Sequence, residues 1–189
     1  MKNPGRNKRT MALINLLDDP DKNVFETVEK ELLKESAMII PELEILWETT
    51  FDEGCQARIE NLIQRLHFKD NYKSFRKWSK QKEPDLLEGF ILASRCNYPD
   101  LSTHWIERRI EEIRRKVWVE LNNSLTSLEK ITVLNHFFFQ ESGFAVDNEN
   151  YYAPKNCFIN QVLETRMGNP ISIALLYTIV ANQLELPVR

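Results

Sequence analysis

The stretch Glu164–Arg189, ETRMGNPISIALLYTIVANQLELPVR, contains a turn, a helix start and an apolar helix in one run. Asn169 is a favourable N-cap residue, and Pro170 suits the first helical position because its missing N–H would have no helical partner there. We therefore predict that Asn169 caps a helix beginning at Pro170. The apolar residues that follow have helical rather than alternating spacing, so this stretch favours a helical fold.

The rest of the chain has the same pattern. Apolar residues recur at spacings of three and four, and the 189 residues include only five glycines. We predict an all-α chain of about eight to ten helices, with one possible strand beginning at Pro187. Ser102 is predicted to cap the longest helix, which has an apolar stripe from Ile106 to Leu121, and Thr126 with Glu129 predicts a capping box.

The first third of the chain resembles the paired helices of HEAT-type repeats, most clearly in LINLLDDPDKNVFETV at residues 13–28. At most two such units are present, so we expect an irregular multi-helix array rather than a full solenoid. The predicted division is a disordered basic tail over residues 1–9, a HEAT-like helical cap over residues 10–69 and a second domain over residues 70–189. One helix of the cap is expected over about 56–67.

Bulk composition excludes several classes of protein. The net charge of −3 gives no general attraction to nucleic acid or anionic membranes. No run of about 18 apolar residues is present, so we predict no membrane span. The three cysteines lack CxxC spacing and the histidines lack ligand spacing, so we predict no metal site and no cofactor. The same cysteines do not suggest a disulfide framework, and we therefore predict a reducing, cytoplasmic location.

The segment Tyr72–Lys82 is basic and aromatic, with Phe75 and Trp78 among its lysines and arginines. Such a segment could stack on single-stranded nucleic acid. The spacing of three between aromatic residues instead favours an amphipathic helix whose rings face the core, and we take nucleic-acid binding as the weaker alternative.

Residues 142–155 form the most irregular segment and are predicted to be a surface loop, a place where function is often carried. Helical order is predicted to resume near Asn156, which we expect to cap the next helix. Cys157 follows it, and a thiol at a helix start is acidified by the helix dipole. The neighbouring Phe158 and Ile159 also fit a buried, inert cysteine.

Three motifs, in order, resemble the SirB-type branch of the transglutaminase-like superfamily. They are Asn-Tyr-Tyr at 150–152, Phe-x-Asn at 158–160 and Arg-x-Gly-x-Pro-Ile-Ser at 166–172. The resemblance implies a bacterial protein and the helical part of a papain-like core. In catalytically competent relatives it also implies a cysteine nucleophile at a helix start, with a histidine and an acid on a following sheet.

Alignment with that family without gaps puts Gly168 on its glycine, Ala174 on its alanine and residues 187–189 on its Pro-x-Arg. The nucleophile position then falls on Pro170, which has no nucleophilic group. The chain stops where the family's first strand is expected, so the resemblance implies a domain that is incomplete at its C-terminus. The apolar terminal helix would then be exposed, and a second copy of the chain could cover it.

We therefore predict a non-catalytic transglutaminase-like protein that serves as a protein-interaction or regulatory module, with no catalytic residues. The rival interpretation is a cysteine-dependent hydrolase or transferase that uses Cys157 or residues beyond Arg189. The tyrosines of the predicted cleft could alternatively pin the loop onto the helices. The predicted cleft residues are Tyr151, Tyr152, Asn156, Arg166, Asn169 and Ser172.

Overall fold

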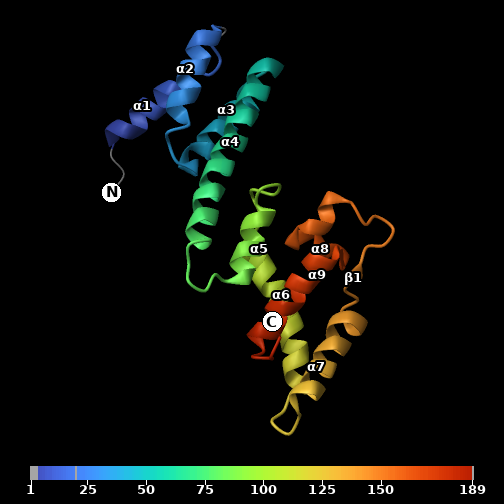
Figure 1. Cartoon of the computed structure of the whole chain (residues 1–189). Coiled ribbons are helices and arrows are strands. Elements are labelled where there is room, and N and C mark those ends of the chain that lie inside the picture. The colour runs from blue at the N-terminus through green and yellow to red at the C-terminus, as the bar shows by residue number, and fades with distance from the viewer. Residues whose placement is uncertain (1–3, 20, 189) are drawn as a thin grey trace. The chain divides into compact units, whose positions relative to one another are not determined.

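The structure is a computed structural model that describes residues 4–19 and 21–188 (Figure 1). Within these residues it contains nine α-helices and two strands of two residues each, which confirms the predicted all-α class. The chain divides into two compact units, one up to Ser74 and one from Phe75 onward. Each unit has its own cluster of buried apolar residues.

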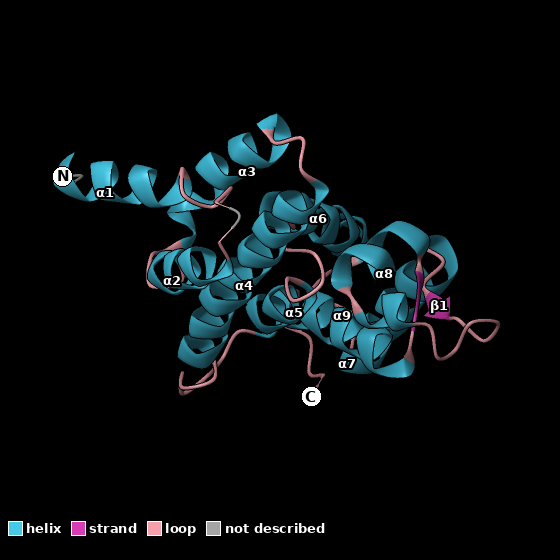
Figure 2. Ribbon diagram, turned by 90° about the horizontal axis from the view of Figure 1, so that it is seen from above, coloured by secondary structure: helices cyan, strands magenta, loops and turns pink. Residues whose placement is uncertain are grey.

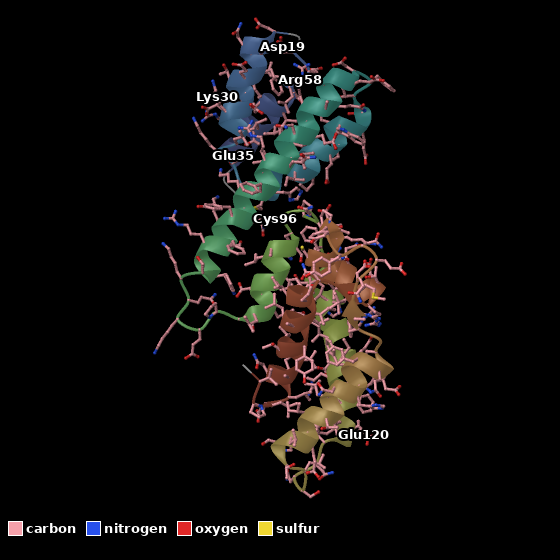
Figure 3. All side chains as sticks on the ribbon, turned by 45° about the vertical axis from the view of Figure 1, so that its right-hand side comes forward. Asp19, Lys30, Glu35, Arg58, Cys96 and Glu120 are labelled. Carbon is pink, nitrogen blue, oxygen red and sulfur yellow. The ribbon has the colours of Figure 1, made fainter. Side chains whose placement is uncertain are left out.

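The first unit contains α1 (Pro4–Ile14), α2 (Lys22–Leu32), a short 3-10 helix (Ala37–Ile39), α3 (Ile40–Thr49) and most of α4 (Glu53–Trp78). Apolar side chains spaced at threes and fours on these helices pack into one core. Arg58 of α4 (Figure 3) lies over this core, with its guanidinium 4.9 Å from the centre of the Phe25 ring. The buried apolar residues of this unit are Ile14, Leu17, Phe25, Val28, Leu32, Ile39, Ile40, Leu43, Cys55, Ile59, Leu62 and Leu66.

Two features of this part of the chain differ from the predictions. Residues 4–9 lie in α1 rather than in a disordered tail, while residues 1–3 lie outside the described part of the chain. The predicted helix over 56–67 and the basic aromatic segment as far as Trp78 form one continuous helix, in which no glycine or proline follows Gly54. HEAT-like pairing of α1–α4 stays a prediction.

The basic aromatic segment ends in a packed tryptophan. Trp78 donates its indole N–H to the Asp85 carbonyl oxygen at 2.7 Å, and its ring occupies the space beside Gly89, where an added Cβ would lie 2.3 Å from it. These contacts support the structural interpretation of Trp78. Tyr72 remains 58% exposed.

The second unit is built on three capped helices: α5 (Leu86–Ser94), α6 (Thr103–Glu120) and α7 (Ser127–Asn135). Ser102 caps α6 and Thr126 forms the predicted capping box with Glu129. α6 is nevertheless shorter than α4, so the prediction that Ser102 caps the longest helix was wrong. Glu120 marks the end of α6, before the connection to α7 (Figure 3). α7 continues into a π-helical segment over His136–Glu141.

The remaining elements are β1 (Ala145–Val146), a 3-10 helix (Pro154–Cys157), α8 (Ile159–Thr165), β2 (Met167–Gly168) and α9 (Pro170–Gln183). The strands pair in parallel, Ala145 with Met167 and Val146 with Gly168 (Figure 2). This pairing attaches the 142–155 loop to the turn before α9. The possible strand at Pro187 is not formed by the described residues 187 and 188.

Six of the 14 residues of α9 are buried, whereas the sequence predicted an exposed terminal helix. It packs against α5, α6 and α8 of the same unit, because its apolar residues lie nearly all round the helix. Ile171, at its start, is 72% exposed. The second unit's core consists of Phe90, Ile91, Ile106, Ile110, Ile113, Val117, Leu134, Phe138, Phe144, Ile159, Val162, Leu163, Ile173, Leu176, Ile179, Val180, Ala181 and Leu186.

Candidate functional site

The turn into α9 has the geometry predicted from the sequence. Asn169 is the N-cap, and its Oδ1 accepts a hydrogen bond from the Ser172 backbone N–H at 2.8 Å. Pro170 occupies the first turn of the helix. The helix therefore begins with a proline, which offers neither a nucleophile nor an N–H.

Ser172 is the nearest hydroxyl, and it is committed to the backbone. Its side chain is buried, and its Oγ donates to the Asn156 carbonyl oxygen at 2.6 Å, with the Asn169 carbonyl oxygen 3.0 Å away. A buried hydroxyl in such contacts holds the turn in place. It is a positioning group rather than an exposed binding group.

Asn156 joins the loop to this turn. Its Nδ2 donates to the Asn150 carbonyl oxygen at 2.8 Å, and its own carbonyl oxygen accepts from the Asn169 N–H at 3.2 Å. It does not cap α8 as predicted. That role falls to Ser94, whose buried Oγ accepts the first N–H of the helix, from Ile159, at 2.9 Å.

Asp147 links the loop to the turn before α9 by hydrogen bonds. Its Oδ1 accepts the Asn150 N–H at 2.9 Å, and its backbone N–H donates to the Gly168 carbonyl oxygen at 2.9 Å. The Asn150 hydrogen bond is the main cause that lowers the pKa of the Asp147 carboxyl, with smaller help from Asn156 and Lys155.

Cys157 lies next to the same turn. Its thiol is exposed, and Asn169 directs its Nδ2 to the sulfur at 3.1 Å. Within the described residues of this unit, neither His104 nor His136 hydrogen-bonds to Cys157. The His136 Nδ1 lies 2.8 Å from Gln140 instead. Cys157 is therefore close in space to the start of α9, although it precedes that helix by more than ten residues in the chain.

Tyr151 and Tyr152 extend from the loop into solvent. Tyr152 is 92% exposed, and its ring contacts that of Tyr151, 5.1 Å away, edge to face. The Tyr152 ring is too exposed to pin the loop to the helices, whereas the Tyr151 ring is only 45% exposed. They add apolar surface near the turn, where Met167 and Ile171 are also exposed.

Arg166 points away from this cluster. It ends α8 in the left-handed conformation, with φ 63°, and its guanidinium lies 4.9 Å from the Phe144 ring. It lines a different pocket, formed with α6 and the end of the π-helical segment. The structure thus brings Asn156, Asn169, Ser172 and Cys157 together and leaves Arg166 apart.

Two positioning residues were missed by the sequence interpretation. Asp147 has a local signal, because an aspartate three residues before Asn150 is typical of a side chain that closes a turn. Ser94 has no local signal, since it acts on Ile159 from another helix. Asn160, the asparagine of the Phe-x-Asn motif, is buried, and its Oδ1 has no hydrogen-bond partner among the described residues.

Between residues 4 and 188, residue 20 excepted, no three His, Cys, Asp or Glu side chains gather in a way that could hold a metal ion. The helices described there are each too short or too polar to cross a bilayer.

Known proteins are similar to this second half of the chain. A family model described as the transglutaminase-like superfamily matches residues 104–189. A UPF0162 protein of Xylella fastidiosa is 31% identical over 103 residues, which cover 54% of this chain and 37% of the relative. Protein SirB1 of Salmonella typhimurium is 27% identical over 103 residues, covering 54% and 38%, and a UPF0162 protein of Vibrio cholerae is 26% identical over 105 residues, covering 56% and 39%. No solved structure matches significantly.

The helical start of α9 and its ordered loop, together with the family match, define residues 104–189 as part of a transglutaminase-like domain. The similarity to SirB1 and to the UPF0162 proteins supports a place in the SirB-type branch of that superfamily. The matched segments cover less than two fifths of the length of these relatives.

Proposed function

We propose that this part of the protein is a non-catalytic binding module that recognises a protein partner through the surface around the α9 turn. The observation that carries the proposal is Pro170 at the helix start. A catalytic relative needs a thiol there, and the neighbouring hydroxyl of Ser172 is buried and hydrogen-bonded.

The exposed side chains near the turn support recognition of a protein. Tyr151 and Tyr152 together with Met167 and Ile171 expose apolar surface on a turn whose backbone is tied down by Asn156 and Ser172. Tyrosines commonly anchor interfaces, since they bury a large area and keep a polar end. A rigid base beneath exposed rings also lowers the entropic cost of binding.

Substitution of the exposed tyrosine tests this proposal. Tyr152→Ala should leave the melting temperature unchanged, because the side chain is 92% exposed, and it should abolish capture of a specific partner from lysate. Leu128→Ala is the matched control, since Leu128 is 76% exposed on α7 and outside this surface. Partner capture that survives in Tyr152→Ala and in Ile171→Ser alike would remove this surface as the binding site.

A second candidate function rests on the position of Cys157. Its exposed thiol lies 3.1 Å from the Asn169 amide at the start of α9, and this proximity supports a nucleophile at that helix start. We infer that, if the protein is an enzyme, Cys157 is the nucleophile of a cysteine-dependent hydrolase or transferase, with a base supplied by other residues.

The rate of alkylation separates the two candidates. An activated thiolate at Cys157 should react with iodoacetamide at about pH 6.5 at least about tenfold faster than the exposed thiol of Cys96, which serves as the internal control. Acyl-substrate turnover lost in Cys157→Ser would support the enzyme. Equal alkylation rates without turnover would leave the binding module as the better account.

A further inference from the structure

A separate pocket of the second unit lies between α6, the end of the π-helical segment and the turn after α8. Its volume is about 450 Å³, within the usual range for small-molecule sites. Arg166 lines it, and so do Arg109, Arg115 and Lys116 of α6, against the carboxylates of Glu112 and Glu141. Four cationic and two anionic side chains leave the lining with a net charge of +2.

Arg166 is the most constrained of these cations. Its left-handed backbone conformation fixes the direction in which its side chain leaves α8, and the guanidinium rests 4.9 Å from the ring of Phe144. Phe144 is itself buried and stacked on Phe138, with 4.6 Å between ring centroids. The cation is therefore held in place before any ligand arrives.

Arg166 forms no ion pair with any of the residues that the structure describes, although the nearby Glu112 carboxylate favours its charged form. Its guanidinium is half-buried, and partial burial, with Arg109 nearby, lowers its pKa. A half-buried cation without a counter-ion is costly, so the arrangement suits an anion that arrives from outside. Glu112 does not fill this role because its carboxylate is held by Arg109 at 2.6 Å.

We propose that this pocket binds the dianionic phosphate of a small phosphomonoester. The guanidinium of Arg166 can present two parallel N–H donors to phosphate oxygens, and Arg109 and Lys116 line the same pocket. A phosphomonoester carries a charge close to −2 at neutral pH, which matches the net charge of the lining. The volume left beside the phosphate, next to Ile113 and Val119, accommodates a small organic group.

This site does not depend on the proposed partner surface, because it shares no residue with the exposed tyrosines or with the α9 turn. The two proposals therefore fail separately. Loss of partner capture in Tyr152→Ala says nothing about the pocket, and loss of phosphate binding in an Arg166 variant says nothing about the partner surface.

Calorimetric titration of the 189-residue chain at constant ionic strength tests the proposal, with glycerol 3-phosphate as the probe. Binding should be saturable, and it should weaken by at least about tenfold in Arg166→Gln, which loses a charged hydrogen-bonding group. Lys116→Gln provides a second variant at an exposed position that does not threaten folding. Arg108→Gln is the matched control, because Arg108 is an exposed arginine of α6 outside the lining, and it should bind as the parent does.

Several outcomes would overturn the proposal. These are the absence of saturable binding in the parent, equal weakening in Arg108→Gln, and unchanged binding in both Arg166→Gln and Lys116→Gln. Inorganic phosphate that binds as tightly as glycerol 3-phosphate would show that only the free ion is recognised. Glutarate that binds as tightly would show that the pocket selects charge rather than phosphate.

Discussion

Single side chains of the α9 turn form hydrogen bonds that leave little freedom to the backbone around Pro170. Asn169 uses both atoms of its amide, accepting from the Ser172 N–H and donating to the Cys157 sulfur. Ser172 in turn uses its hydroxyl on the Asn156 carbonyl. The hydrogen bonds of Ser172 are buried or part-buried, so loss of either would leave an unsatisfied partner behind. The turn is therefore rigid because of a few specific residues.

Gly168 provides a test of this rigidity. A Cβ added there would lie 2.5 Å from the Ser172 Oγ and 3.0 Å from a methyl group of Val162, so Gly168→Ala should destabilise the protein by about 1–3 kcal/mol in urea unfolding. In a Ser172→Ala background the nearest clash is gone, and the cost of the same substitution should fall. An equal cost in both backgrounds would contradict the steric account.

Ser94 provides a second test at a single residue. Its buried Oγ accepts the Ile159 N–H and donates to the Phe90 carbonyl, both at 2.9 Å. Ser94→Ala leaves that N–H without its partner and should cost about 1–3 kcal/mol of unfolding free energy. Ser79→Ala is the control, since Ser79 is exposed and donates to a single carbonyl. If the two variants unfold at the same urea concentration, Ser94 does not support α8.

Among the helices, what the sequence could predict was local. Ser102, Thr126 and Asn169 were identified as caps because a cap and the N–H it satisfies lie within three residues of each other. The helical class could be predicted from apolar spacing, because that spacing also depends on residues close together in the sequence. The α8 cap was misassigned to Asn156 because its real partner, Ser94, is 65 residues away.

In the candidate site, too, only features that depend on neighbours in the sequence could be predicted. The positions of Asn169 and Pro170 could be predicted, because a helix start depends on neighbours in sequence. The separation of Arg166 from the other predicted residues could not, because the direction of its side chain depends on a left-handed backbone angle and on packing against Phe144. Burial of Asn156 likewise depends on tertiary packing.

The 142–155 loop should respond to acid through Asp147. The hydrogen bond from Asn150 lowers the pKa of the Asp147 carboxyl in the folded state. The carboxylate therefore stabilises the fold fully above its unfolded-state pKa of about 4, and this stabilisation is lost as pH falls through the lower folded-state pKa. Asp147→Asn should therefore melt below the parent at pH 7, with a difference that shrinks toward pH 3. Glu149→Gln, an exposed change in the same loop, should show no such trend. A difference between Asp147→Asn and the parent that is constant with pH would exclude this role.

Within residues 4–19 and 21–188, nearly all buried apolar residues belong to two clusters, and each cluster comes from one continuous part of the sequence. One cluster comes from residues 14–66 and the other from residues 90–186. A segment with its own core is the physical definition of a domain. The proposed division into a cap over residues 10–69 and a transglutaminase-like segment over residues 70–189 rests on this observation.

A chain of residues 70–189 alone should therefore fold. We expect a helical circular dichroism spectrum and a single cooperative urea transition, because the segment contains all of its own buried cluster. Ile110→Ala in this shorter chain should lower the unfolding free energy by about 2–5 kcal/mol, since Ile110 is fully buried on α6. Val119→Ala, at a position of the same helix that is 72% exposed, should change it by less than about 0.5 kcal/mol. A gradual transition, or equal effects of the two substitutions, would mean that the segment does not form this core by itself.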